Sequence, residues 1–192
     1  TGKPLVVVLI HGRVYTINWI AENADAIVDA WYPGEAGGMA VAEVLFGDYN
    51  PGGKLTVSVP RHVGQLPVYY YHRYAGYRKH LDLDAAGPLY PFGFGLSYTT
   101  FKHANLKIQP QSIRKGESAQ VAVDVTNTGR MAGDEVVPLY IRDEVASVAR
   151  PPLQLKGFQR IHLQPGETKT VAFDIGREEL CFYGLDHKWI VE

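Results

Sequence analysis

The sequence predicts an α/β region followed by an all-β region: a partial parallel α/β sandwich and then an antiparallel β-sandwich. Over residues 1–67, short apolar runs alternate with helical patterns, which is typical of a parallel sheet with packed helices. Residues 68–100 have no sustained period of either kind. Residues 101–192 consist of short alternating segments between turns, which indicates strands. We therefore expect an α/β domain at 1–67, a linker at 68–100 and a β-sandwich at 101–192.

The first part has the pattern βαβαβ. Its expected strands and helices, in order, are residues 4–10, 17–24, 25–32, 39–46 and 55–59. The first run is continuously apolar and too short for a helix, so it suits a strand covered on both faces. The two helical segments carry apolar residues on one side only. Gly47 follows the second of them, where a left-handed cap is expected.

The linker is rich in tyrosine and also holds a basic cluster. Aromatic residues at this density are typical of a segment packed between domains; the alternative is a sugar-binding surface, because flat rings suit the apolar faces of pyranoses. The basic cluster is expected to be a solvated loop surface rather than a metal site, since its histidines lack ligand spacing. Its members are His72, Arg73, Arg78, Lys79 and His80.

Turns separate the strands of the third part. Residues 119–126 alternate strictly, with valines on one face, and a turn follows at 127–129. Further strands are expected at 136–142, 153–163, 168–175 and 180–191. Regular spacing of this kind indicates an antiparallel sandwich.

Composition excludes several classes of function. Nineteen basic and twenty acidic residues give a net charge of −1, so there is no electrostatic basis for binding nucleic acid or an anionic membrane. No apolar run is long enough to span a bilayer. Cys181 is the only cysteine, which excludes an internal disulfide and a zinc site built on cysteines. We expect no metal and no cofactor.

The spacing of the residues excludes two further functions, phosphate binding and serine-esterase catalysis. The glycines at 34–38 fit neither the dinucleotide-binding pattern nor the P-loop, so their expected role is conformational. His11-Gly12 after a strand is similar to the oxyanion loop of serine esterases. However, no serine of the chain lies in a G-x-S-x-G elbow.

Several stretches match one family pattern in order. They are TGKPLVVVL at 1–9, GR at 12–13, DAIVDAWYPG at 25–34, GGMAVAEVLFGDYNPGGKL at 37–55, YPFGFGLSYTTF at 90–101, VTNTG at 125–129, VVPLYI at 136–141 and LKGFQRI at 155–161. Together they resemble the C-terminal part of family 3 glycoside hydrolases, the β-glucosidase and β-xylosidase group. The resemblance covers nearly the whole chain.

The resemblance implies a fibronectin type III-like sandwich and a parent enzyme that hydrolyses terminal non-reducing β-D-glucosyl or xylosyl residues with retention. In such enzymes an Asp nucleophile lies in an N-terminal barrel, and the acid/base is usually a Glu on a loop before the TGKP strand. Neither segment matches this chain, so we assign it no catalytic residue and expect it to be inactive alone. The family pattern adds one strand after residue 191, so the sandwich is expected to lack its last strand. The implied partners are an oligosaccharide or aryl β-glycoside and the missing barrel, and the implied compartment is the periplasm or the exterior.

The candidate substrate contacts are Arg13, Tyr15, Trp31 and Glu35. Loops at 11–15 and 32–37 leave neighbouring parallel strands on the same side, where α/β sheets gather ligands, so we expect them to rim a sugar site. Arg13 suits paired hydrogen bonds to hydroxyls or a carboxylate, and its structural alternative is an interdomain clamp. The alternative for Glu35 is a solvated carboxylate near a helix N-terminus. Asp48, Asp82 and Asp84 are interpreted as turn formers.

Three hypotheses therefore stay open. The chain is a β-glycosidase fragment, a carbohydrate-binding module, or a structural module that stabilises a neighbour. The binding module requires an exposed aromatic platform, for which Trp19, Trp31 and the aromatics at 69–77 are available.

Overall fold

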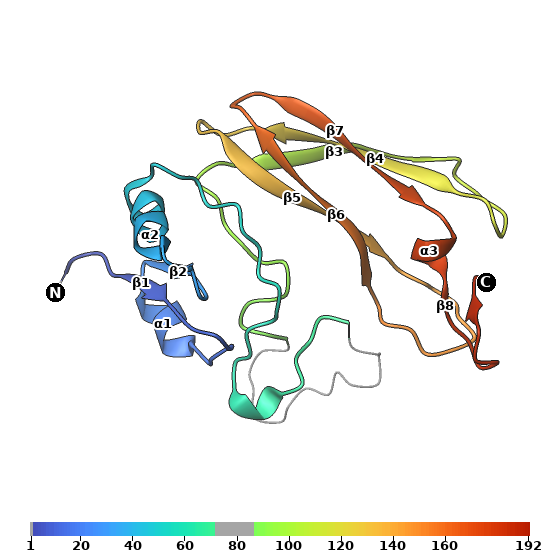
Figure 1. Cartoon of the computed structure of the whole chain (residues 1–192), viewed down its shortest axis with the longest axis horizontal. Coiled ribbons are helices and arrows are strands. Elements are labelled where there is room, and N and C mark those ends of the chain that lie inside the picture. Colours follow the sequence, from blue (N-terminus) through green and yellow to red (C-terminus); the bar gives the residue numbers. More distant parts are fainter. Residues whose placement is uncertain (1, 72–86) are drawn as a thin grey trace. The chain divides into compact units, whose positions relative to one another are not determined.

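The computed structural model describes residues 2–71 and 87–192 (Figure 1). They fall into two compact units. The first unit contains residues 2–49, 54–70 and 87–95, and the second contains residues 50–53, 71 and 96–192. The basic cluster, Asp82, Asp84 and the aromatic residues at 72–77 lie outside the described residues, so the predictions made for them stay predictions.

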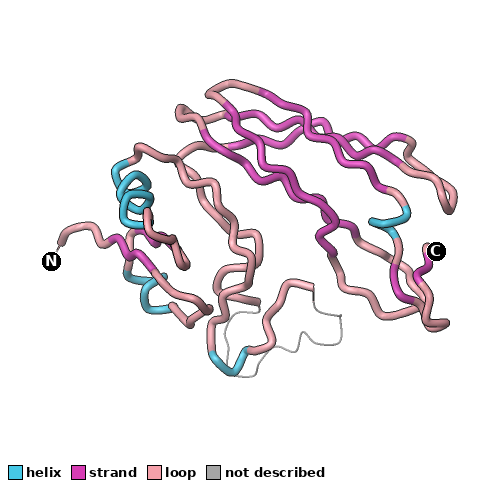
Figure 2. The backbone as a smooth tube through the Cα atoms, in the orientation of Figure 1, coloured by secondary structure: helices cyan, strands magenta, loops and turns pink. Residues whose placement is uncertain are grey.

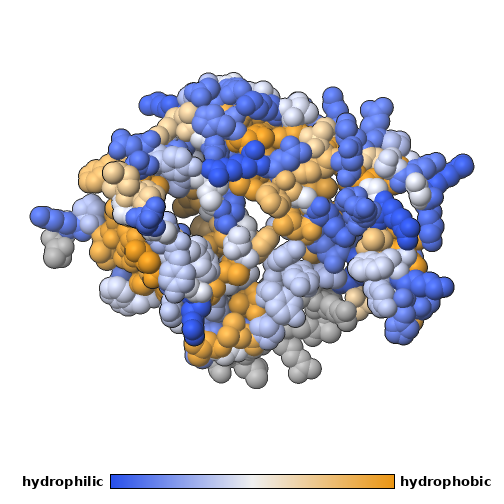
Figure 3. Space-filling model, in the orientation of Figure 1, coloured by the Kyte–Doolittle hydropathy of each residue, from blue (hydrophilic) through white to orange (hydrophobic). Residues whose placement is uncertain are grey.

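The first unit begins with the predicted strand, helix, strand and helix. Strands β1 (Val6–Leu9) and β2 (Ala26–Asp29) pair in parallel, with α1 (Asn18–Asn23) between them and α2 (Gly37–Phe46) after them. Gly47 has a φ of 83° and caps α2 in the left-handed conformation, as its position predicted. Strand β1 is not covered on both faces by the described residues, because Val6 remains 45% exposed. Apolar surface of the first unit is visible at the left of Figure 3.

The predicted third strand at residues 55–59 is wrong as a member of the parallel sheet. The Leu55 N–H donates to Phe94 O over 2.8 Å, and the Val59 N–H donates to Tyr90 O over 2.8 Å. An isolated antiparallel bridge joins Val59 to Tyr90. The alternation in the sequence is real, but its partner lies in the segment that sequence reasoning assigned to the linker. A short 3₁₀ turn, η1 (Val63–Gln65), follows.

The second unit is the predicted antiparallel sandwich. Two sheets, β3-β4-β7 and β5-β6, form its layers (Figure 2). The strands are β3 (Phe101–Gln109), β4 (Ala119–Asn127), β5 (Gly133–Ile141), β6 (Gln154–Leu163) and β7 (Thr168–Ile175). The inward-facing residues Val125, Val137, Leu163 and Val171 form its core. Val121 and Val125 are both buried, which confirms the alternation predicted for β4.

Two details of the second unit differ from the prediction. Residues 180–191 do not form one strand, because α3 (Arg177–Leu180) is followed by a hairpin of β8 (Phe182–Tyr183) and β9 (Trp189–Ile190). His187 has a φ of 58° in the connecting turn, a conformation that reverses the chain. No residue range was predicted for β3, because a bulge between Ala104 and Lys107 interrupts the alternation of its residues.

Two buried asparagines connect distant segments of the second unit. The Asn50 amide donates to Ala132 O over 2.9 Å, while its Oδ1 accepts from the Ser97 hydroxyl and the Tyr98 N–H. Asn127 is fully buried and makes four hydrogen bonds. These bonds hold residues 50–53, 97–99 and 127–133 together within one network.

Candidate functional site

The candidate site lies in the first unit, where the chain leaves β1 and β2. Their pairing continues past both strands, because the His11 N–H donates to Trp31 O over 3.2 Å. Since the strands are parallel, the loops after Leu9 and Asp29 emerge at the same edge. This confirms that the two predicted loops are neighbours.

Three rings cluster at this edge. The His11 ring centroid lies 5.3 Å from that of Tyr15, edge to face, and 4.9 Å from that of Trp31. Trp31 has a φ of 50°, a left-handed conformation that is uncommon for a bulky side chain. Strain of this kind persists only where the surroundings enforce it. The His11 ring and the backbone bond from the His11 N–H provide such surroundings.

The imidazole of His11 also faces an acidic group. Its Nε2 lies 3.0 Å from Asp29 Oδ1, and the two side chains are 10% and 22% exposed. The distance is that of an ion pair, but Asp29 Oδ1 forms no hydrogen bond of good geometry within the described residues. His11 Nδ1 is likewise buried without a hydrogen-bond partner among the described residues, and so is Oδ1 of Asn18, the first residue of α1. Buried polar atoms nearly always have a hydrogen-bond partner, so these three atoms make this edge a candidate binding site.

A small, partly open hollow lies among these side chains. It holds about one water molecule. Its walls are Leu9, His11, Val14, Tyr15, Ile17, Asp29, Trp31 and Val59. Aromatic walls with a few polar groups are typical of small ligand sites.

The four predicted contact residues separate into two pairs. Tyr15 and Trp31 both line the hollow. The Arg13 and Glu35 side chains are exposed, and neither makes a hydrogen bond or ion pair with another described residue. Asp29 was not among the predicted site residues, and His11 was considered only as part of an esterase-like oxyanion loop. The usable signal was a histidine and an aspartate at the ends of two adjacent parallel strands.

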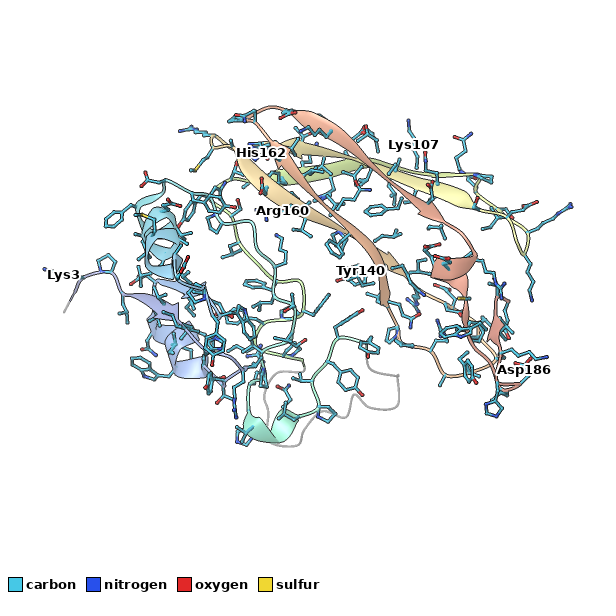
Figure 4. All side chains as sticks on the ribbon, viewed as in Figure 1. Lys3, Lys107, Tyr140, Arg160, His162 and Asp186 are labelled. Carbon is cyan, nitrogen blue, oxygen red and sulfur yellow. The ribbon has the colours of Figure 1, made fainter. Side chains whose placement is uncertain are left out.

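A second polar cluster lies on the β5-β6 sheet of the second unit. His162 Nδ1 lies 2.7 Å from Asp134 Oδ1, and the Arg160 Nε donates to Asp134 Oδ2 over 2.7 Å. Figure 4 labels Arg160 and His162 on β6. Partial burial works against ionisation of Asp134, but hydrogen bonds and charge from His162 and Arg160 outweigh it. The pKa of Asp134 is therefore lowered. Because Arg160 and His162 already contact both oxygens of the carboxylate, we interpret this cluster as structural.

Within residues 2–71 and 87–192, no three His, Cys, Asp or Glu side chains are grouped so as to hold a metal ion. Over the same ranges, no helix is both long and apolar enough to cross a bilayer.

Comparison with known families decides the class of the chain. Residues 1–98 match the glycosyl hydrolase family 3 C-terminal domain, and residues 135–192 match the fibronectin type III-like domain. The chain belongs to glycosyl hydrolase family 3. This confirms the resemblance and the two-part fold class that the sequence predicted.

Relatives of this family 3 chain are glycosidases. A β-xylosidase from Formosa agariphila is 54% identical over 100% of the chain, which spans 27% of that protein. A periplasmic β-glucosidase from Salmonella typhimurium is 46% identical over 100% of the chain, which spans 26% of it. The chain therefore spans about a quarter of the length of these relatives.

Solved structures agree with the fold of the family 3 chain. A β-glucosidase from Listeria innocua in complex with glucose superposes with a TM-score of 0.93 at 38% identity, covering 100% of the chain and 28% of that structure. A β-glucosidase from Erythrobacter marinus gives a TM-score of 0.93 at 49% identity, covering 97% of the chain and 25% of that structure. The roles assigned to Arg13, Tyr15, Trp31 and Glu35 stay predictions.

Proposed function

We propose that this chain is the C-terminal part of a longer retaining β-glycosidase that removes terminal non-reducing β-D-glucosyl or β-D-xylosyl residues. The observation that carries the proposal is full-length similarity of the chain to about a quarter of a β-xylosidase and a β-glucosidase. Retaining hydrolysis uses two carboxyl groups about 5–5.5 Å apart. We place both on sequence outside this chain, the nucleophile as an Asp of a barrel and the acid/base as a Glu.

Within that enzyme, the loops after β1 and β2 contribute to the sugar site. Tyr15 and Trp31 offer ring surface to a pyranose, and their position beside the hollow supports this role. Arg13 and Glu35 are exposed on the same two loops, where hydroxyl groups of a substrate can reach them. The chain thus shapes the site without performing the bond cleavage.

The test compares the purified chain with the longer polypeptide that contains it. Aryl β-glucoside and aryl β-xyloside are supplied to each at equal molar concentration. We expect turnover by the longer polypeptide and none by the chain alone. Hydrolysis by the purified chain would refute the placement of the carboxylates. Absence of turnover by the longer polypeptide on both substrates would refute the glycosidase proposal itself.

A non-catalytic carbohydrate-binding module is the second candidate. The observation in its favour is exposed aromatic surface on the first unit, where Trp19 is 68% and Tyr69 is 49% exposed. Titration of the chain with cello- or xylo-oligosaccharides, followed by tryptophan fluorescence, tests it. Saturable quenching that Trp19→Ala abolishes would favour this candidate, whereas an unchanged signal would remove it.

We also propose a periplasmic or secreted location. The name of the Salmonella typhimurium relative supports the periplasm. Fractionation of cells expressing the longer polypeptide checks the location, and activity confined to the cytoplasm would contradict it.

A further inference from the structure

His11 has one ring nitrogen beside a carboxylate and one ring nitrogen without a partner among the described residues. Nε2 lies 3.0 Å from Asp29 Oδ1, while Nδ1 is buried and has no hydrogen-bond partner. The side chain is nine-tenths buried and forms part of the wall of the hollow with Tyr15 and Trp31. A histidine packed only for its shape would not need a buried nitrogen at such a wall, because an unpartnered polar atom is unfavourable there.

The position of Asp29 determines what Nδ1 offers. A carboxylate beside Nε2 favours the proton on that nitrogen, and in neutral imidazole the other nitrogen is then an acceptor. The group that satisfies Nδ1 must therefore donate a hydrogen bond. The hollow has room for about one water-sized group, and its other walls are mainly apolar or aromatic. A single hydroxyl group meets both conditions.

We propose that His11 Nδ1 accepts a hydrogen bond from one hydroxyl group bound in this hollow, and that the His11–Asp29 pair thereby positions the rings of Tyr15 and Trp31. The hydroxyl belongs to an ordered water in the free chain or to a sugar that enters the hollow. The assignment to a sugar rests on the proposed function, whereas the assignment to a hydroxyl donor does not. His11 is a positioning residue in this proposal and takes no part in bond cleavage.

The left-handed backbone of Trp31 agrees with this role. Its carbonyl accepts from the His11 N–H, and its ring lies against the His11 ring. One histidine therefore fixes Trp31 through both backbone and ring. Loss of the bound hydroxyl is expected to loosen the ring cluster first, since the backbone bond does not involve the imidazole.

Nitrogen NMR on the ¹⁵N-histidine-labelled chain tests the hydroxyl site without any activity measurement. We expect His11 to show the Nε2–H form with a hydrogen-bonded Nδ1 acceptor, and Asp29→Asn to shift the proton distribution toward Nδ1. Titration with methyl β-glucoside or methyl β-xyloside separates the two sources. A change at Nδ1 assigns the donor to a sugar hydroxyl, and no change assigns the donor in the free chain to water. An Nδ1–H form in the wild-type chain, or an Nδ1 shift without hydrogen bonding, would overturn the proposal.

A matched pair of variants in the longer polypeptide tests the positioning role. His11→Gln keeps a donor near the Nε2 position but loses the Nδ1 acceptor, while His11→Asn keeps an acceptor near the Nδ1 position. Loss of one neutral hydrogen bond corresponds to a fall in kcat/KM of about twofold to twelvefold. We expect this fall for His11→Gln, mainly in KM, with His11→Asn within about twofold of wild type.

Each kinetic outcome decides one question. Equal kcat/KM for wild type and a folded His11→Gln would overturn the positioning role. An equal fall in both variants with a matching loss of stability would do so too, because it indicates a structural role alone. If wild type turns over no glycoside, the proposed function fails, and the NMR result on the chain still decides the hydroxyl site.

Discussion

Replacing Asn127 with alanine is expected to destabilise the second unit by about 3–5 kcal/mol. The Asn127 amide donates to Met131 O over 2.9 Å and to Leu163 O over 3.0 Å. Its Oδ1 accepts from the Thr99 hydroxyl over 2.7 Å and from the Gly129 N–H over 3.0 Å. Alanine leaves four groups without this partner, in a place where Asn127 itself is 0% exposed.

The magnitude follows from what each group loses. A buried polar group left unsatisfied costs about 1–3 kcal/mol. A water entering the space left by the amide would satisfy some of the four groups, so we take the low end of that range, about 1 kcal/mol for each group and about 4 kcal/mol in total. Since domains are stable by about 5–15 kcal/mol, the loss is a large fraction of the total. It also exceeds the effect of most single substitutions.

Urea unfolding of the purified chain, followed by near-ultraviolet circular dichroism, measures the change. Gln120→Ala is the matched control, because Gln120 is an exposed amide on the same strand and makes one bond of 3.1 Å to Asp174. We expect that control to stay within about 0.5 kcal/mol of wild type. A free energy of unfolding for Asn127→Ala within about 1 kcal/mol of wild type would refute the reasoning.

Three further predictions concern other positions. Gly47→Ala should cost about 1–2 kcal/mol, because the α2 cap requires a φ of 83°; Gly47→Asn should cost less, and equal losses in urea unfolding would contradict the cap argument. Asp134 has a lowered pKa, so its ionised form stabilises the folded state, by at most about 1 kcal/mol for a pair half open to solvent. This stabilisation is complete above the ordinary carboxyl pKa and disappears as the pH falls through the lowered pKa. The difference in free energy of unfolding between wild type and Asp134→Asn should therefore narrow below about pH 4. A difference that widens there would contradict the lowered pKa. Glu35→Gln in the longer polypeptide should change kcat less than about threefold, since an exposed carboxylate that pairs with none of the described residues is not placed as an acid/base; a fall of a thousandfold would show that it is one.

The sequence predicts most of the sandwich because its signals are local. Alternation at 119–126 and 168–175 places one face of each strand in the core, and β4 and β7 occupy these positions almost residue for residue. The strand predicted at 180–191 is wrong because the apolar content of these residues suits a strand, whereas the turn around His187 divides them into a hairpin. Residues 55–59 form no strand, because a bend lies at 56–57 and only Val59 makes a β-bridge; alternation within a segment cannot identify the segment that pairs with it.

The candidate site is less predictable because it depends on contacts across the chain. Parallel pairing places the loops after β1 and β2 together, and the sequence suffices to predict Tyr15 and Trp31 near each other. The contact between His11 and Asp29 depends on which side chains turn inward at the strand ends, and the periodicity of a short apolar run does not contain that information. Positive φ at Trp31 is likewise a product of the surrounding fold, since the residue itself disfavours it.

Three of the motifs that identify the family contribute residues that hold the second unit together. Asn50 belongs to the DYNPGG stretch, Ser97 and Thr99 to GLSYTT, and Asn127 to VTNTG, yet they meet in one hydrogen-bond network. Buried amides of this kind tolerate few replacements, because each leaves donors and acceptors unpaired. These three stretches therefore specify the fold of the second unit. Differences between glucosidases and xylosidases of this family should be sought in the loops at 11–15 and 31–37, where Arg13 and Glu35 are exposed and substitution does not break the network.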